Sequence, residues 1–168
     1  MKKAFTLMEL IIAILILSLL MLFLYKSYSN LNKSNRVYSR LVDHLTTVEH
    51  IRKTLYLDLS MATRESIIIE HIDKQYDFIS FETKNSLHKR INPYVCYLIK
   101  ENILYRLESL IQITSTEISR DIEFDIDKVT NVKKLKLFTT RDKKRELYLL
   151  DLRLKETQKM LLKVKVLN

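Results

Sequence analysis

Four acidic residues, at every second position from Asp121 to Asp127, are the strongest candidates for chemistry in this chain, and the residues between them are apolar. On a strand the four carboxylates share one face and offer the oxygen ligands that calcium prefers. Same-face neighbours on a strand stand about 6.5–7 Å apart, so one straight strand cannot bring all four to one ion. We therefore interpret them as a solvated face and predict no metal site. We expect it to be opposed by a lysine of the next strand, at Lys133, Lys134 or Lys136.

The remaining reactive side chains do not form a catalytic set. Cys96 alternates with Tyr94 and Leu98, which predicts a core thiol, and a single cysteine excludes a disulfide within the chain and a cysteine-rich zinc site. The chain has no glycine, which excludes glycine-rich phosphate loops and nucleophile elbows. We predict no enzyme activity and no cofactor. The histidines are scattered, at His44, His50, His71 and His88.

The net charge of +9 comes from one part of the chain, because residues 128–168 hold 13 Lys and Arg against 4 Asp and Glu. Lys143, Lys144 and Arg145 fall in a predicted turn over 141–145 and form a candidate patch for an anionic partner. Binding of DNA phosphates is one interpretation. Few aromatic residues accompany these cations, which favours a solvated face or an acidic protein neighbour over DNA.

The N-terminal segment is long and apolar enough to cross a membrane. Residues 5–25 form a run of 21 residues in which Glu9 is the single charge, and about 20 helical residues span a bilayer core. A secretory signal peptide also begins with basic residues and an apolar stretch. The sequence after the stretch lacks the small residues of its cleavage site, so we predict a retained single span. A carboxylate inside such a span marks a functional position by default.

The residues around Glu9 identify the segment. Residues 2–10, Lys-Lys-Ala-Phe-Thr-Leu-Met-Glu-Leu, resemble the prepilin cleavage and methylation motif of type IV pilins and type II secretion pseudopilins. The resemblance implies that prepilin peptidase cuts between Ala4 and Phe5 and that the Phe5 amine is methylated. The family usually has Gly where this chain has Ala4. It also implies a role for Glu9 as the counter-charge to the Phe5 ammonium of a neighbouring subunit, which sets the register of assembly.

The rest of the sequence predicts an α+β fold, with a long N-terminal helix packed on a mostly antiparallel sheet. Apolar heptad positions continue the helix over 26–62, with a dimeric coiled coil as the alternative to packing on the sheet. Beyond residue 63 apolar and polar residues alternate, which predicts strands, and Glu101-Asn102 indicates a two-residue hairpin loop. The organisation expected is a leader over 1–4, a transmembrane helix over 5–25, its amphipathic continuation over 26–62 and a β-rich domain over 63–168. The predicted strands cover 66–71, 77–83, 94–100, 103–109, 122–127, 132–139, 147–155 and 161–167.

Residues 57–64, 77–83, 95–99 and 102–106 are similar to the J-type minor pseudopilins and the W-type minor pilins, whose usual turn carries Asp-Gly where this chain has Glu101-Asn102. This resemblance implies a structural subunit that initiates or caps a periplasmic filament of a type II secretion, type IV pilus or DNA-uptake system. Its partners would be other pilins or pseudopilins, prepilin peptidase and the bacterial inner membrane, with the N-terminus cytoplasmic and the C-terminal domain periplasmic. A membrane-anchored periplasmic binding protein that does not polymerise is the alternative.

Overall fold

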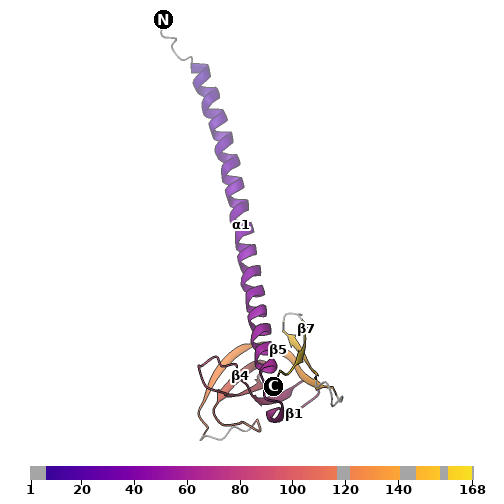
Figure 1. Ribbon diagram of the computed structural model, residues 1–168. Helices are drawn as coiled ribbons and strands as arrows, with labels where there is room; N and C mark the ends of the chain where they lie inside the picture. The colour runs from indigo at the N-terminus through magenta and orange to yellow at the C-terminus, as the bar shows by residue number, and fades with distance from the viewer. Residues whose placement is uncertain (1–6, 117–121, 141–146, 156–158, 168) are drawn as a thin grey trace. The chain divides into compact units, whose positions relative to one another are not determined.

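The computed structural model describes residues 7–116, 122–140, 147–155 and 159–167. It has one long helix, α1 (Leu7–Ser60), a single 3-10 turn, η1 (Arg64–Ser66), and a seven-stranded sheet (Figure 1). The strands are β1 (Ile68–His71), β2 (Asp77–Glu82), β3 (Tyr94–Lys100), β4 (Ile103–Ser109), β5 (Phe124–Thr139), β6 (Leu147–Leu154) and β7 (Lys159–Lys165).

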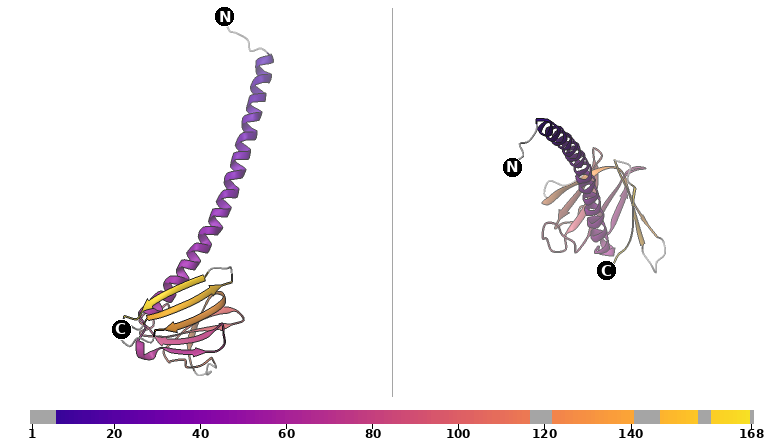
Figure 2. Two further views of the ribbon diagram at one scale, coloured as in Figure 1. Left: turned by 90° about the vertical axis from the view of Figure 1, so that its right-hand side faces the viewer. Right: turned by 90° about the horizontal axis from the view of Figure 1, so that it is seen from above.

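The predicted α+β class is confirmed. The chain divides into two compact units, Met1–Val48 and Glu49–Asn168, and α1 contributes residues to both. The second unit contains the end of α1 and the whole sheet. Every neighbouring pair of strands is antiparallel and consecutive in sequence, so the sheet is a simple meander (Figure 2).

Each face of the β2–β4 part of the sheet carries buried residues that pack against a different part of the chain. One face carries Tyr97 and Arg106, which bond to Asp58 of α1, and the helix buries Leu55 and Leu59 in the same unit. The opposite face carries a separate apolar cluster with Phe78, Cys96, Leu107 and Ile113 as its buried members. Cys96 is 1% exposed, which confirms the predicted core thiol, and burial raises its pKa far above the ordinary range.

The sequence patterns predicted some strand boundaries correctly and missed one strand junction. β3 and β4 have the predicted bounds, but residues 124–127 of one predicted strand and all of another, 132–139, belong to the one strand β5, which pairs first with β4 and then with β6. Lysines of 133–136 therefore do not lie across from the acidic row. Asp125 bonds to Arg90 at 2.9 Å, and Asp127 lies 2.9 Å from His88.

The β3–β4 hairpin is the two-residue turn that the sequence predicts. Glu101 and Asn102 have φ of 54° and 62°, the left-handed region that a type I′ turn requires at both central residues. Asparagine tolerates this region, whereas for glutamate it costs about 1–2 kcal/mol relative to the right-handed region. Because the chain has no glycine, a glutamate occupies this position of the β3–β4 turn despite the steric cost.

We therefore expect Glu101→Gly to stabilise the protein by about 1 kcal/mol, because glycine adopts positive φ without the steric cost. Urea denaturation of the full chain in detergent micelles measures the change. The matched control is Glu70→Gly, at an exposed glutamate of β1, which should destabilise the protein by about 0.5–1 kcal/mol. Equal destabilisation by both substitutions would contradict strain at Glu101.

Candidate functional site

The first described turn of α1 carries the acidic residue that the sequence singled out. Ala4 and Phe5 lie outside the described residues, whereas Glu9 lies in the first turn of the helix with its side chain exposed. A carboxylate is favourable at that end, because the free backbone N–H groups of the first turn carry partial positive charge. The position is therefore suited to holding a negative charge next to an apolar segment.

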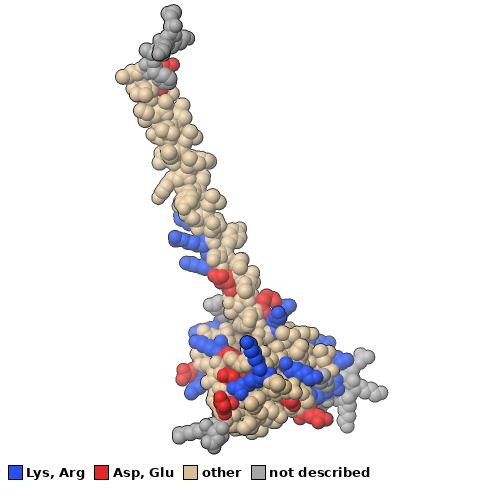
Figure 3. All heavy atoms as spheres, turned by 60° about the vertical axis from the view of Figure 1, so that its left-hand side comes forward, with Lys and Arg blue, Asp and Glu red and all other residues tan. Residues whose placement is uncertain are grey.

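The helix after Glu9 presents apolar side chains on every side. Large apolar residues from Leu10 to Tyr25 are each at least half exposed, and Figure 3 shows no Lys or Arg side chain along this stretch. The single hydroxyl between Leu10 and Leu24, on Ser18, donates to the Ile14 carbonyl at 2.8 Å. With its polar groups satisfied within the helix, the segment fits lipid or a dry protein interface.

Residues 1–25 match the Prokaryotic N-terminal methylation motif. This match supports a type IV pilin-like protein, a structural class and not a known family of enzymes. Together with the apolar part of α1, which is long enough to cross a bilayer, it is consistent with a single-pass membrane anchor that undergoes N-methylation. No curated protein and no solved structure matches the chain.

A buried ion-pair cluster joins the end of α1 to the sheet. Arg106 of β4 donates through Nε to one oxygen of Asp58 at 2.8 Å and through Nη2 to the other at 3.3 Å. Its Nη1 donates to Glu108 at 2.7 Å, and the hydroxyl of Tyr97 donates to Asp58. All four residues are at most 1% exposed. Burial alone would lower the pKa of Arg106, but its hydrogen bonds to Asp58 and Glu108, together with the charge of Asp58, outweigh that effect and raise the pKa.

The loop between β2 and β3 closes over the same cluster. The hydroxyl of Thr83 donates to the Asp58 carbonyl at 2.9 Å, and the amide of Asn85 donates to the Asp58 carboxylate. Glu108 accepts from the Ser86 hydroxyl and, at 3.0 Å, from the Leu87 N–H. Burial would raise the pKa of Glu108, but these bonds together with Arg106 hold it below its ordinary value.

The cluster is suited to fixing structure, because its buried charges are already satisfied by one another. Its acids and its arginine are paired, and none of its residues lines the described cavity of this unit. Within the described residues no group of three or more His, Cys, Asp or Glu is gathered as a metal site. Sequence reasoning missed the cluster. The available signal was Asp58 between two leucines near the helix end, with Arg106 and Glu108 alternating inside an apolar strand.

The basic C-terminal quarter is described only in part. Lys143, Lys144 and Arg145 lie outside the described residues. On β7 charged and apolar residues alternate, since Lys163 and Lys165 are exposed while Leu162 and Val164 are buried. This region therefore places exposed cations over a packed apolar face.

The lowered pKa of Glu108 predicts a pH-dependent contribution to stability. Glu108→Gln should lower the free energy of unfolding at pH 7 by about 2 kcal/mol, because hydrogen bonds to a charged group are lost. Since the carboxylate binds its proton less readily in the folded state, the wild type loses this contribution as the pH falls below about 4.3, the ordinary glutamate value. The difference between variant and wild type should therefore shrink with acidification.

Urea denaturation at pH 7, 5, 4 and 3 measures this difference, which should begin to shrink only below about pH 4.3. Glu70→Gln, at the exposed glutamate of β1, is the control and should have little effect at each pH. A Glu108→Gln deficit that stays constant or grows as the pH falls would contradict the assignment.

Proposed function

We propose that the chain is a minor pilin or pseudopilin, a structural subunit that initiates or caps a periplasmic filament of a type II secretion, type IV pilus or DNA-uptake system. The observation that carries the proposal is the match of residues 1–25 to the methylation motif, continued by the exposed apolar stretch of α1. The similarity of residues 57–64, 77–83, 95–99 and 102–106 to J-type pseudopilins and W-type minor pilins supports the finer assignment.

In this proposal the chain begins as an inner-membrane protein. Residues 5–25 span the bilayer, and the basic residues Lys2 and Lys3 keep the leader, residues 1–4, in the cytoplasm. The helix continues on the periplasmic side as far as Ser60, short of the predicted end at residue 62, and residues 63–168 form the periplasmic domain. Prepilin peptidase removes the leader after Ala4, and the new amine of Phe5 is methylated.

Assembly uses the same apolar helix in a second environment. When α1 leaves the lipid, its exposed side chains bury themselves against the helices of neighbouring subunits. In that dry core the Phe5 ammonium needs a counter-charge, which Glu9 of a neighbour supplies. A buried ion pair contributes more to specificity of register than to net stability, because the free energy of removing both charges from water offsets most of their mutual attraction.

The test compares Glu9→Leu with wild type in cells that express the full chain and its filament partners. We expect both to lose residues 1–4, as intact-mass spectrometry shows, while the variant disappears from chemically cross-linked multimers. The control is Glu49→Leu, at a glutamate of α1 that forms an exposed ion pair with Arg52, worth about 0–1 kcal/mol.

Two outcomes would contradict the proposal. Retention of residues 1–4 in cells that contain prepilin peptidase would rule out processing as a prepilin. Wild-type chain that is processed but never cross-links to a pilin would instead favour the membrane-anchored binding protein that does not polymerise.

A further inference from the structure

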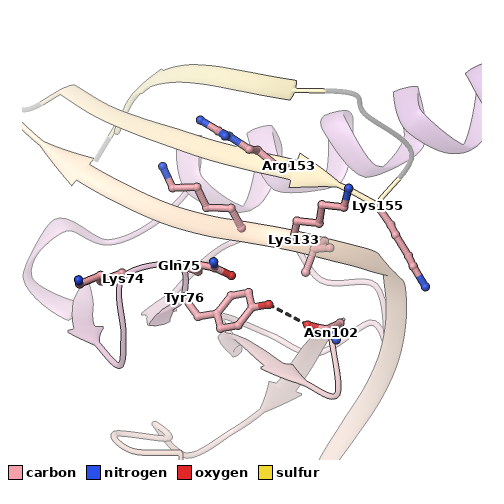
Figure 4. A pocket seen from close by; sticks show the side chains of 9 residues that line it. Lys74, Gln75, Tyr76, Asn102, Lys133, Arg153 and Lys155 are labelled. Carbon is pink, nitrogen blue, oxygen red and sulfur yellow. Dashed lines mark hydrogen bonds between the residues drawn. The ribbon is translucent and has the colours of Figure 1, made fainter.

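A cavity of about 580 Å³ lies within the second unit and is lined by cations. No Asp or Glu is among the described residues that line it, although Asp and Glu make up 20 residues of the chain. Figure 4 shows how Tyr76 points to Asn102 on one side, while Lys133, Arg153 and Lys155 come from β5 and the end of β6. Five of its lining residues are basic: Lys74, Lys133, Lys134, Arg153 and Lys155.

The path of β5 creates this cavity. β4 pairs with β5 only as far as Asn131, after which the Val132 N–H donates to the Asn102 carbonyl at 2.8 Å. Three residues later the Leu135 N–H donates to the Gln75 carbonyl at 2.9 Å, in the segment before β2. The β5–β6 register shifts between Val132 and Lys134. The cavity lies at this bulge, between the β3–β4 turn and the segment before β2. The hydrogen bond from Tyr76 to Asn102, 2.8 Å long, connects these two segments.

Basic residues lie directly opposite one another on the neighbouring strands beside the cavity. Lys134 of β5 is the direct cross-strand partner of Arg153 of β6, and Arg153 is the direct partner of Lys159 of β7. Like charges directly opposite each other destabilise a sheet. Asp151 relieves part of this repulsion, since its carboxylate accepts from Lys134 at 2.6 Å but stays 3.9 Å from Arg153.

The remaining cations have no acidic partner within the part of the chain that the structure describes. Lys74, Lys133 and Lys155 form no ion pair there. Asn102 adds a further donor to the cavity. Its carboxamide oxygen already accepts from Tyr76, so its NH2 group is the part that is left to bind a ligand. A site of free donors and net positive charge is complementary to anionic oxygens.

The volume and the lining of the cavity favour some classes of anionic ligand over others. A volume of about 580 Å³ lies within the range of pockets that hold a ligand of drug size, about 300–1,000 Å³, so it exceeds what one small ion fills. Single-stranded nucleic acid binds on platforms of several aromatic rings, and Tyr76 is the one aromatic residue among the described lining. The cations also line a concavity, whereas a DNA duplex needs an open basic surface along its backbone.

We propose that this cavity is a binding site for an acidic peptide segment of a partner protein, which places two or more carboxylates between Lys133, Arg153 and Lys155. The chain is itself strongly basic, with a net charge of +9, so the partner is a different, acidic protein. The inference goes beyond the proposed function and does not depend on it, because the site belongs to the second unit alone.

The test uses the full chain in zwitterionic detergent micelles and a hexaglutamate peptide labelled with an uncharged dye, with fluorescence anisotropy as the readout. We expect saturable binding that weakens with salt, and no binding of hexaglutamine. The double variant Lys133→Ala, Arg153→Ala should weaken binding about tenfold or more, since charged hydrogen bonds are lost. The matched control Lys163→Ala, Lys165→Ala removes the same charge from exposed positions of β7 that do not line the cavity, and it should stay within about twofold of wild type.

Circular dichroism and thermal melting check that both double variants keep the fold. Three results would overturn the inference: no binding of hexaglutamate, equal weakening by the two double variants, or tighter binding of duplex DNA or inorganic phosphate through the same cavity residues. Because the assay needs neither a leader cleavage nor a filament, its failure leaves the Glu9 experiment untouched. Failure of the Glu9 experiment in turn leaves this site untouched.

Discussion

The ion pair of Asp58 and Arg106 is the interaction on which the second unit depends. It joins the last turn of α1 to the middle of the sheet with two hydrogen bonds, and both side chains are fully buried. A buried charge without its partner costs several kcal/mol, so the helix end and β4 are stable only in this arrangement. Tyr97 and Asn85 donate to the Asp58 carboxylate, and Glu108 accepts from Arg106.

The two parts of α1 are consequently under different constraints. Residues near Asp58 pack into the sheet, with Ile51, Leu55 and Leu59 buried, while apolar side chains from Leu7 to Leu45 stay exposed. One end of the helix is therefore committed to the fold of its own chain. The other end has apolar surface to bury elsewhere, which is the physical requirement for both membrane insertion and helix packing between subunits.

The sequence predicts those parts that local patterns control. The apolar run and the spacing of Glu9 identify the N-terminal segment, and Glu101-Asn102 predicts the hairpin that follows β3. Prediction from the sequence fails where contacts between distant segments determine the structure. β5 is one strand because β4 and β6 pair with different lengths of it. The Asp58–Arg106 pair and the basic cavity each combine residues of separate segments, so a pattern within one segment does not show which residues come together. Lys133, Arg153 and Asn102 meet only after the sheet has formed.

A double-mutant cycle between Asp58 and Arg106 tests this account most directly. Urea denaturation of the full chain in detergent gives the free energy of unfolding for wild type, Asp58→Asn, Arg106→Met and the double variant. The account predicts that each single change costs about 3–5 kcal/mol and that the double change costs less than their sum by more than about 1 kcal/mol. Additive losses would mean that the two residues act independently, which would contradict an ion pair that holds the helix end to the sheet.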